Sequence, residues 1–302
     1  MKELIFGTTA YKILCGDCAS DKLSHAYMLN FPDAKNLKNA LMLFALKFFG
    51  AQDNSPLGAR ILNGSYPDLK VYPADGKKLT ADAVAELLDD CAMRPVEGRK
   101  KLYVISGFDT ASALLQNKLL KTLEEPLEGV HFLLGACSLA PVLDTVKSRV
   151  KLLEIAPFTE EQIYAALERQ GHREINAAAA KSANGILGVA ENMALGGWFG
   201  EILKAAKEIC SVTRIGNIGA VAAKYGDTKY KNELLCEMQR LYFAALGGKE
   251  QLPLLQPALI YALESLNGAF ADLKFNAFFQ GLLYGFMLGV VEENEKWQKL
   301  SA

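Results

Sequence analysis

Short apolar runs alternate with helical segments over the first half of the chain, and this alternation restricts the fold more than any other feature. It is clearest between Arg99 and Phe158, where three such runs are separated by one strong and one weaker helical segment. Apolar strands joined by crossover helices are typical of a parallel sheet that is buried on both faces. The sequence therefore predicts a three-layer α/β domain with a five-stranded parallel sheet. The expected strands lie at 25–29, 68–72, 101–105, 131–136 and 151–155.

The segments between these runs carry helix signals. Thr80 is a candidate N-cap for a helix whose apolar positions Val84, Leu87, Leu88 and Cys91 follow helical spacing. Residues 50–67 are rich in Gly, Pro, Asn and Asp and are expected to form a loop. The remaining helices of this domain are expected at 8–23, 35–49, 110–125 and 140–147.

After Pro157 the chain shows only helical patterns. Thr159 and Gln162 form a capping box at the start of the first helix. The later helices are separated by turn signals at Asn184-Gly185, Gly226-Asp227, Gly247-Gly248 and Asn267-Gly268. Aromatic residues crowd the last two helices, and we expect them to form a bundle core and in part to pack on other subunits. The expected helices lie at 174–182, 185–195, 198–212, 216–224, 228–246, 254–270 and 273–291.

A chain of 302 residues is longer than a single hydrophobic core usually supports, so more than one domain is expected. We predict an α/β domain over 1–157, a small helical lid domain over 158–197 and a C-terminal helical oligomerisation domain over 198–302. The 33 basic and 34 acidic residues give a formal net charge of −1, so the chain lacks the overall positive field of a protein that binds nucleic acid by itself, while a local basic patch stays open. The sequence has neither a signal peptide nor an apolar run long enough for a membrane span, so we expect a cytoplasmic protein without membrane contact.

Six cysteines are scattered along the chain, and this spacing favours reduced thiols over disulfides. Cys15 and Cys18 form a CxxC pair, which is half of a zinc or redox motif, but no second pair of ligands follows at close spacing. Packing of the two thiols on a helix face is the alternative that we favour. No bound metal is therefore expected.

Three segments resemble the clamp-loader branch of the AAA+ proteins, which in bacteria are subunits of the DNA polymerase III clamp-loading complex. They are HAYML at 25–29, NKLLKTLEEPLEGVHFLLGACS at 117–138 and KSRV at 147–150. The resemblance extends from residue 1 to about 195, and residues 198–302 match only as a helical domain in the corresponding place. It implies an AAA+ α/β domain, a helical lid and a C-terminal collar-like domain.

The resemblance also exposes a degenerate nucleotide site. A motor subunit of this family carries GxxGxGK[ST] after its first strand, where glycines let backbone N–H groups approach phosphate and a lysine neutralises its charge. Here all three glycines are missing, Leu37 and Lys38 occupy the lysine and hydroxyl positions, and Asp33 adds a negative charge. We therefore expect no bound ATP. The eight residues of this stretch are Phe31, Pro32, Asp33, Ala34, Lys35, Asn36, Leu37 and Lys38.

The acidic pair of an ATPase is also missing. After the strand at 101–105, the family's active members need Asp-Glu to hold Mg²⁺ and to activate water, and this chain has Ser106-Gly107. Asp109 is interpreted as the N-cap of the next helix. Residues 50–66 lack the cysteines of the family's zinc module, and Val189 stands where an ATP-sensing arginine is expected. Neither magnesium nor zinc is expected to bind.

Unlike the motifs for nucleotide and metal, the Ser-Arg pair of the family is present, as Ser148-Arg149. In the family the corresponding Ser-Arg-Cys motif supplies an arginine to the ATP site of the adjacent subunit, and Val150 replaces the usual cysteine here. A guanidinium suits this role because its fixed N–H donors can span the charge that develops on a transferred phosphoryl group. The alternative is a surface arginine paired with a carboxylate.

These features together imply a non-catalytic clamp-loader subunit that acts on a neighbour's ATP through Arg149. The implied partners are tau/gamma and delta clamp-loader subunits, and the assembled complex would place a sliding clamp on primed DNA. Two alternatives stay open: a divergent AAA+ ATPase with an unusual phosphate loop, and an interaction module outside replication.

Overall fold

The computed structural model describes residues 1–74, 78–168, 173–275 and 277–301. The chain divides into two compact units. The first unit comprises residues 1–169 with 183–190, and the second comprises 170–182 with 191–302. The predicted division into three domains, with boundaries after 157 and 197, stays a prediction.

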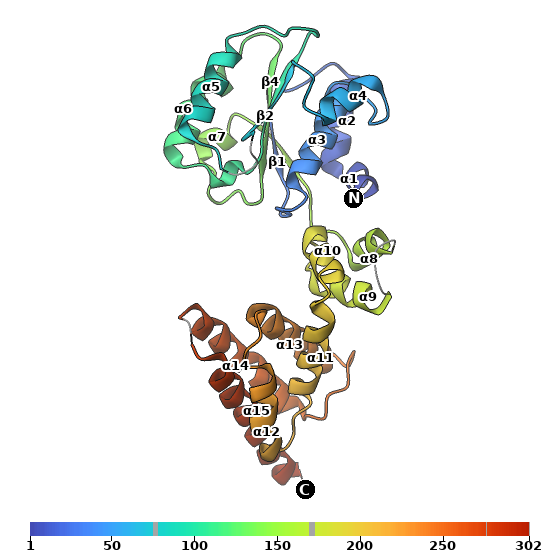
Figure 1. Ribbon diagram of the computed structural model, residues 1–302, viewed down its shortest axis with the longest axis vertical. Coiled ribbons are helices and arrows are strands. Elements are labelled where there is room, and N and C mark those ends of the chain that lie inside the picture. Colours follow the sequence, from blue (N-terminus) through green and yellow to red (C-terminus); the bar gives the residue numbers. More distant parts are fainter. Residues whose placement is uncertain (75–77, 169–172, 276, 302) are drawn as a thin grey trace. The chain divides into compact units, whose positions relative to one another are not determined.

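The first unit contains the predicted five-stranded parallel sheet (Figure 1). Its spatial order is β2-β3-β4-β1-β5, so β1 lies between β4 and β5. Each strand begins and ends within one residue of its predicted position. The strands are β1 (Ala26–Asn30), β2 (Leu69–Tyr72), β3 (Lys101–Ile105), β4 (Val130–Ala136) and β5 (Lys151–Glu154).

Helices cover both faces of this sheet, which explains why its central strands are apolar on both sides (Figure 1). On one face, Tyr103 and Phe132 stack with their ring centroids 5.5 Å apart and pack against buried residues of the covering helices. On the other face Gly135 is required, because a side-chain carbon there would lie 2.6 Å from a methyl group of Leu41. The helices of the first face are α5 (Ala81–Cys91), α6 (Ala113–Glu124) and α7 (Asp144–Lys147), and those of the second are α1 (Lys2–Gly7), α2 (Thr9–Ala19), α3 (Leu37–Phe48) and α4 (Pro56–Leu62).

Local capping sets several helix starts. Thr80 accepts a hydrogen bond from the Ala83 N–H as predicted, and the capping box of Thr159 and Gln162 opens α8 (Glu160–Leu167). The predicted cap at Asp109 is wrong: that residue lies in the 3₁₀ helix Phe108–Thr110, and Ser112 caps α6 instead. Helix α4 forms where a loop is expected from the sequence, because Ser55 caps it and Pro56 stands at its first position, where proline is well tolerated.

Asp68 holds the loop that follows α5. Its buried carboxylate accepts hydrogen bonds from three consecutive backbone N–H groups, those of Val96 at 2.5 Å, Glu97 at 2.9 Å and Gly98 at 2.7 Å. Buried N–H donors without a partner are costly to stability. This single carboxylate avoids that cost for three donors of the loop.

The second unit is helical in its described residues. The predicted breaks at Gly226-Asp227 and Gly247-Gly248 are confirmed, whereas the break at Asn267-Gly268 is wrong because α14 continues through it. Buried Leu263, Leu266 and Ala269 keep one face of α14 in the core on both sides of Gly268, and this burial outweighs the low helix propensity of glycine. The helices that contribute to it are α9 (Arg173–Ser182), the part of α10 (Leu187–Leu195) from residue 191 on, α11 (Phe199–Cys210), α12 (Ile215–Tyr225), α13 (Lys231–Leu246), α14 (Gln256–Lys274) and α15 (Phe279–Ser301).

The expected aromatic core of this unit is only partly formed. Phe279 and Phe286 are buried, but the side chains of Phe275 and Phe278 are 85% and 72% exposed. Asn276, within the predicted last helix, lies outside the described residues. Over the part of the chain that is described, no helix combines the length and apolar character that a membrane span requires.

Candidate functional site

The residues predicted to form a degenerate nucleotide site lie at the edge of the sheet where the parallel strands end. The loop after β1 and the Ser106-Gly107 pair after β3 both follow the carboxyl ends of parallel strands, which meet at the same edge. Cys137, which follows β4, lies near them: burial raises the pKa of its thiol to about 11, and the carboxylates of Asp109 and Asp33 contribute to the shift. The structure therefore brings the two predicted halves of the site together.

Asp33 occupies the centre of the loop and is only 1% exposed. Its carboxylate accepts hydrogen bonds from the Asn36 backbone N–H at 3.1 Å and from the Asn36 side-chain amide at 2.9 Å. The Leu37 N–H, the first of α3, donates to the Asp33 carbonyl oxygen at 2.8 Å. In a phosphate loop the N–H groups at this helix start point at phosphate. Here Asp33 already uses the first of them.

The same carboxylate binds a segment far away in the sequence. We call residues 183–190 the lid segment; it belongs to the first unit, and its Gly188 N–H donates to Asp33 Oδ2 at 2.7 Å. Gly188 is required there, because a side-chain carbon would overlap the Asp33 carboxylate. Gly188 is the second residue of α10, so Asp33 supplies a negatively charged cap to the orphan N–H groups at the start of that helix. Asp33 thus ties the lid segment to the α/β sheet.

A second set of contacts fixes the base of the lid segment. The Phe158 N–H donates to the Gly185 carbonyl oxygen at 2.9 Å, and the ring of Phe158 packs edge-on against Phe31. Gly185 has φ of +80°, and a side chain there would collide with Pro157. The predicted break at Asn184-Gly185 is therefore confirmed, and a requirement for close approach explains its glycine.

The other residues of the loop divide by burial. Phe31, Asn36 and Leu37 are buried, Pro32 is half-buried, and Ala34, Lys35 and Lys38 are exposed. Val189 of the lid segment is 37% exposed. The apolar side chain of Leu37, at the position that the resemblance assigns to the phosphate-binding lysine, therefore fills the core.

Ser106 and Gly107 contribute no carboxylate to this edge. Ser106 donates its backbone N–H to the Tyr72 carbonyl oxygen at 2.8 Å, and Gly107 adopts φ of +68° to start the 3₁₀ helix. Asp109 follows in that helix, half-buried, and its buried Oδ1 atom has no hydrogen-bond partner among the described residues. Within the described ranges, no group of three or more His, Cys, Asp or Glu residues could hold a metal ion.

The CxxC pair lies on α2 and not at this edge. Cys15 and Cys18 are both half-buried, and the Cys18 thiol donates to the Lys47 carbonyl oxygen at 3.7 Å. Burial raises the pKa of Cys18, which disfavours the thiolate that metal binding and redox chemistry need. This environment agrees with packing on a helix face.

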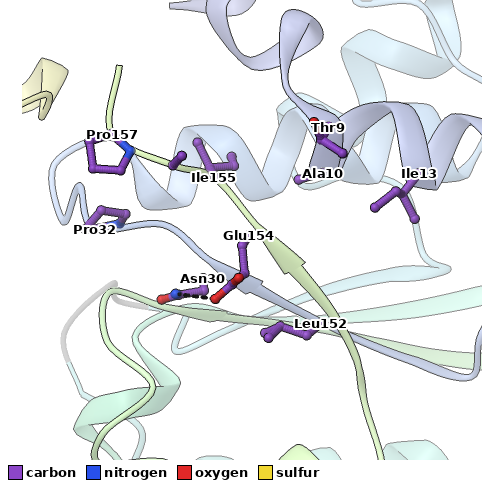
Figure 2. Close-up of a pocket in the computed structure, with 10 residues that line it drawn as sticks. Thr9, Ala10, Ile13, Asn30, Pro32, Leu152, Glu154, Ile155 and Pro157 are labelled. Atoms are coloured by element: carbon purple, nitrogen blue, oxygen red, sulfur yellow. Dashed lines mark hydrogen bonds between the residues drawn. The ribbon is translucent and has the colours of Figure 1, made fainter. Parts of the chain in front are cut away.

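A cavity of about 600 Å³ lies beside the loop, between the start of α2 and the edge strand β5 (Figure 2). Asn30, at the end of β1, and Glu154, at the end of β5, point toward each other on its floor and form a 3.3 Å hydrogen bond. Pro32 of the loop also lines the cavity. Its other walls are mostly apolar, and this cavity was not expected from the sequence.

Arg149 lies at the opposite end of the strands, the end at which the parallel strands begin. It follows α7 and precedes β5, whose first residue, Lys151, is in register with Tyr27 of β1. The loop with Asp33 begins four residues beyond Tyr27, and at about 3.3 Å per strand residue this separates the two levels by roughly 13 Å. Arg149 therefore cannot reach the degenerate site of its own chain.

The Arg149 guanidinium is held within its own chain. Nε donates to Glu124 Oε1 at 2.6 Å, and a second, very short contact joins NH2 to the same carboxylate oxygen. NH1 donates to the Thr145 carbonyl oxygen at 2.7 Å and to the Ser148 hydroxyl at 3.1 Å. The side chains of Arg149 and Glu124 stay 31% and 46% exposed. The predicted Ser-Arg pair is thus in contact, and Glu124 is a partner that the sequence did not single out.

Sequence reasoning missed two features of the site, and only the first of them had a local signal. Asp33 and Asn36 are three residues apart before an apolar helix, which is the spacing at which an acidic side chain accepts from a helix-start N–H. Glu124 stands at the end of a helical pattern, but no local signal connects it to Arg149, 25 residues later.

Comparisons with known proteins agree with the resemblance in the sequence. A family model described as "DNA polymerase III, delta subunit" matches residues 7–159. The DNA polymerase III subunit delta' of Bacillus subtilis is 32% identical over 158 residues, 50% of this chain and 48% of that protein. The DNA polymerase III subunit tau/gamma of Haemophilus influenzae is 31% identical over 157 residues, 50% of this chain and 23% of that protein. The matched regions thus span about half or less of these relatives' length.

Among solved structures, the chain was also compared with a DNA polymerase III gamma subunit-related protein from Thermotoga maritima. It aligns with a TM-score of 0.48 and 13% sequence identity, over 95% of this chain and 100% of that one. The parallel sheet, the helices on its two faces and the helical remainder of the described chain agree with the AAA+ fold class expected from the sequence.

Proposed function

Because the chain belongs to the DNA polymerase III delta subunit family, we propose that it is a non-catalytic clamp-loader subunit that resembles delta'. In this proposal it holds no ATP of its own and supplies Arg149 to the ATP site of a neighbouring tau/gamma subunit. Its relatives among delta' and tau/gamma subunits support this assignment.

The environment of Asp33 supports the absence of ATP. Phosphate at the start of α3 would compete for N–H groups that already donate to Asp33, and it would lie beside a buried negative charge. Two unit charges 4 Å apart repel by about 4 kcal/mol at an effective dielectric constant of 20. Neither Ser106 nor Gly107 has a carboxylate to hold magnesium.

The position of Arg149 is the observation that carries the proposal. It lies at the edge of the sheet opposite the degenerate site, and its guanidinium is partly exposed. An arginine so placed has no role at its own nucleotide site but is available to a neighbour. Fixed guanidinium donors that contact a transferred phosphoryl group from an adjacent subunit stabilise the charge of the transition state.

The partners follow from the family. We propose that the chain assembles with tau/gamma and delta subunits in the cytoplasm, and that the complex opens a sliding clamp and places it on primed DNA. With 33 basic and 34 acidic residues, the chain itself has no net positive charge to hold DNA, so DNA contact is expected to come mainly from the assembly.

Reconstitution with tau/gamma and delta subunits tests this function. Arg149→Ala should assemble normally, and the ATPase site that it faces should lose about 10³-fold or more in turnover. Arg94→Ala removes an exposed arginine elsewhere in the same unit and should leave turnover unchanged. Unchanged ATPase activity with Arg149→Ala would refute the role in trans, and stoichiometric ATP binding to the isolated chain would favour the divergent ATPase.

A further inference from the structure

We infer that Glu124 lowers the affinity of the neighbouring site for ATP, because it occupies the edge of the Arg149 guanidinium that a triphosphate would use. The inference rests on the proposed function of Arg149 and adds to it a residue that tunes the same site. Glu124 is the last residue of α6, and Arg149 follows α7. Their contact therefore joins two neighbouring crossover helices at one edge of the sheet.

The donors of Arg149 are nearly all in use. A guanidinium has five N–H groups. Nε and NH2 each donate once to Glu124 Oε1, and NH1 donates both of its hydrogens, to the Thr145 carbonyl oxygen and the Ser148 hydroxyl. Contacts with the described residues thus leave one hydrogen of NH2. Paired recognition of a phosphate needs two parallel N–H donors, so the arrangement in the free chain cannot provide it.

The contacts on the two sides of the guanidinium differ in how easily a phosphoryl group can replace them. The contacts of NH1 are made to the backbone of α7 and to the adjacent Ser148, so they orient the guanidinium plane from within its own segment. The contacts of Nε and NH2 are made to one flexible carboxylate that is 46% exposed. A phosphoryl group can therefore replace Glu124 on that side while Thr145 and Ser148 keep the plane in position.

The Glu124 carboxylate occupies the guanidinium donors that phosphate would use. Because ATP must displace it, the pair of Glu124 and Arg149 opposes nucleotide binding by the free energy of a partly exposed ion pair. Pairs of this kind contribute little, equivalent to at most about a fivefold change in an equilibrium constant. Once Glu124 is displaced, it has no part in the phosphoryl transfer, so the rate at saturating ATP should not depend on it.

The test measures the ATP dependence of the turnover that Arg149→Ala removes from the reconstituted complex. Glu124→Gln keeps the side-chain shape and removes the charge, and we expect it to lower KM for ATP by about two- to fivefold without a loss of kcat. Glu124→Asp keeps the charge on a shorter side chain and should return KM toward the wild-type value. Glu125→Gln removes an exposed charge one residue away and should change neither constant.

The outcomes separate this inference from the proposed function. A lower kcat with Glu124→Gln would overturn the inference, because it would mean that Glu124 orients Arg149 for the reaction. An unchanged KM would overturn it as well. In the double variant, Glu124→Gln should add nothing to Arg149→Ala, since Glu124 acts through the guanidinium. If Arg149→Ala itself has no effect, the proposed function fails first, whatever Glu124→Gln does.

Discussion

Replacement of Asp33 should loosen the lid segment without unfolding the sheet. The Asp33 carboxylate is 1% exposed and accepts the Gly188 N–H at 2.7 Å, a shorter bond than either of those from Asn36. Asp33→Ala removes this acceptor and leaves the N–H at the start of α10 without a charged partner. We expect residues 183–190 to open more often, because this bond must break whenever the segment leaves the sheet.

The size of the effect follows from the type of bond. A hydrogen bond to an ionised group contributes about 1.5–3 kcal/mol. Every 1.4 kcal/mol changes an opening equilibrium about tenfold, so the Gly188 amide should exchange its hydrogen roughly 10- to 100-fold faster in Asp33→Ala. Asp33→Asn keeps one acceptor oxygen without the charge and should give an intermediate rate.

Hydrogen exchange followed by mass spectrometry measures this directly on the isolated chain. Peptides that cover 183–190 report the lid segment, and peptides from β4 report whether the sheet stays folded. Asn36→Ala is the matched control, because it removes the side-chain bond to Asp33 at 2.9 Å but keeps the carboxylate and its bond to Gly188. If exchange in 183–190 is the same in Asp33→Ala as in the wild type while β4 stays protected, Asp33 does not hold the lid segment.

Two further predictions concern stability. Asp68→Ala leaves three consecutive N–H groups after α5 without their acceptor, so the free energy of unfolding measured with urea should fall by about 3 kcal/mol or more; a change under about 1 kcal/mol would contradict this. For Asp90, burial acts to raise the pKa, but hydrogen bonds from Lys101 and Tyr103 outweigh it and lower the pKa below its usual value. A lowered folded pKa stabilises the fold above the unfolded value of about 3.9, and this contribution is lost as the pH falls through the folded pKa. Unfolding free energies between pH 5 and pH 3 should therefore decline more steeply in the wild type than in Asp90→Asn, and equal slopes would refute the assignment.

The sheet and most helices could be predicted because their signals are local. An apolar run that is buried on both faces identifies a central strand wherever it lies, and capping residues such as Thr80 and Thr159 act on N–H groups three residues away. The errors have two causes: burial outweighed a local signal at Gly268, and a local cap at Ser55 outweighed the turn-rich composition around α4. Gly268 remains helical because apolar residues on both sides of it are buried, and α4 forms where turn-rich composition predicted a loop.

The sequence alone determined that the loop after β1 lacks the residues of a phosphate site and that a Ser-Arg pair precedes β5. Only the tertiary structure decided what these residues do in place of nucleotide contact. Asp33 accepts a hydrogen bond from Gly188, which lies 155 residues later in the chain, and Arg149 pairs with Glu124 at the end of another helix. Sequence spacing cannot predict such pairs, because a charged side chain takes the donors or acceptors that the topology of the sheet places beside it, however distant they are along the chain.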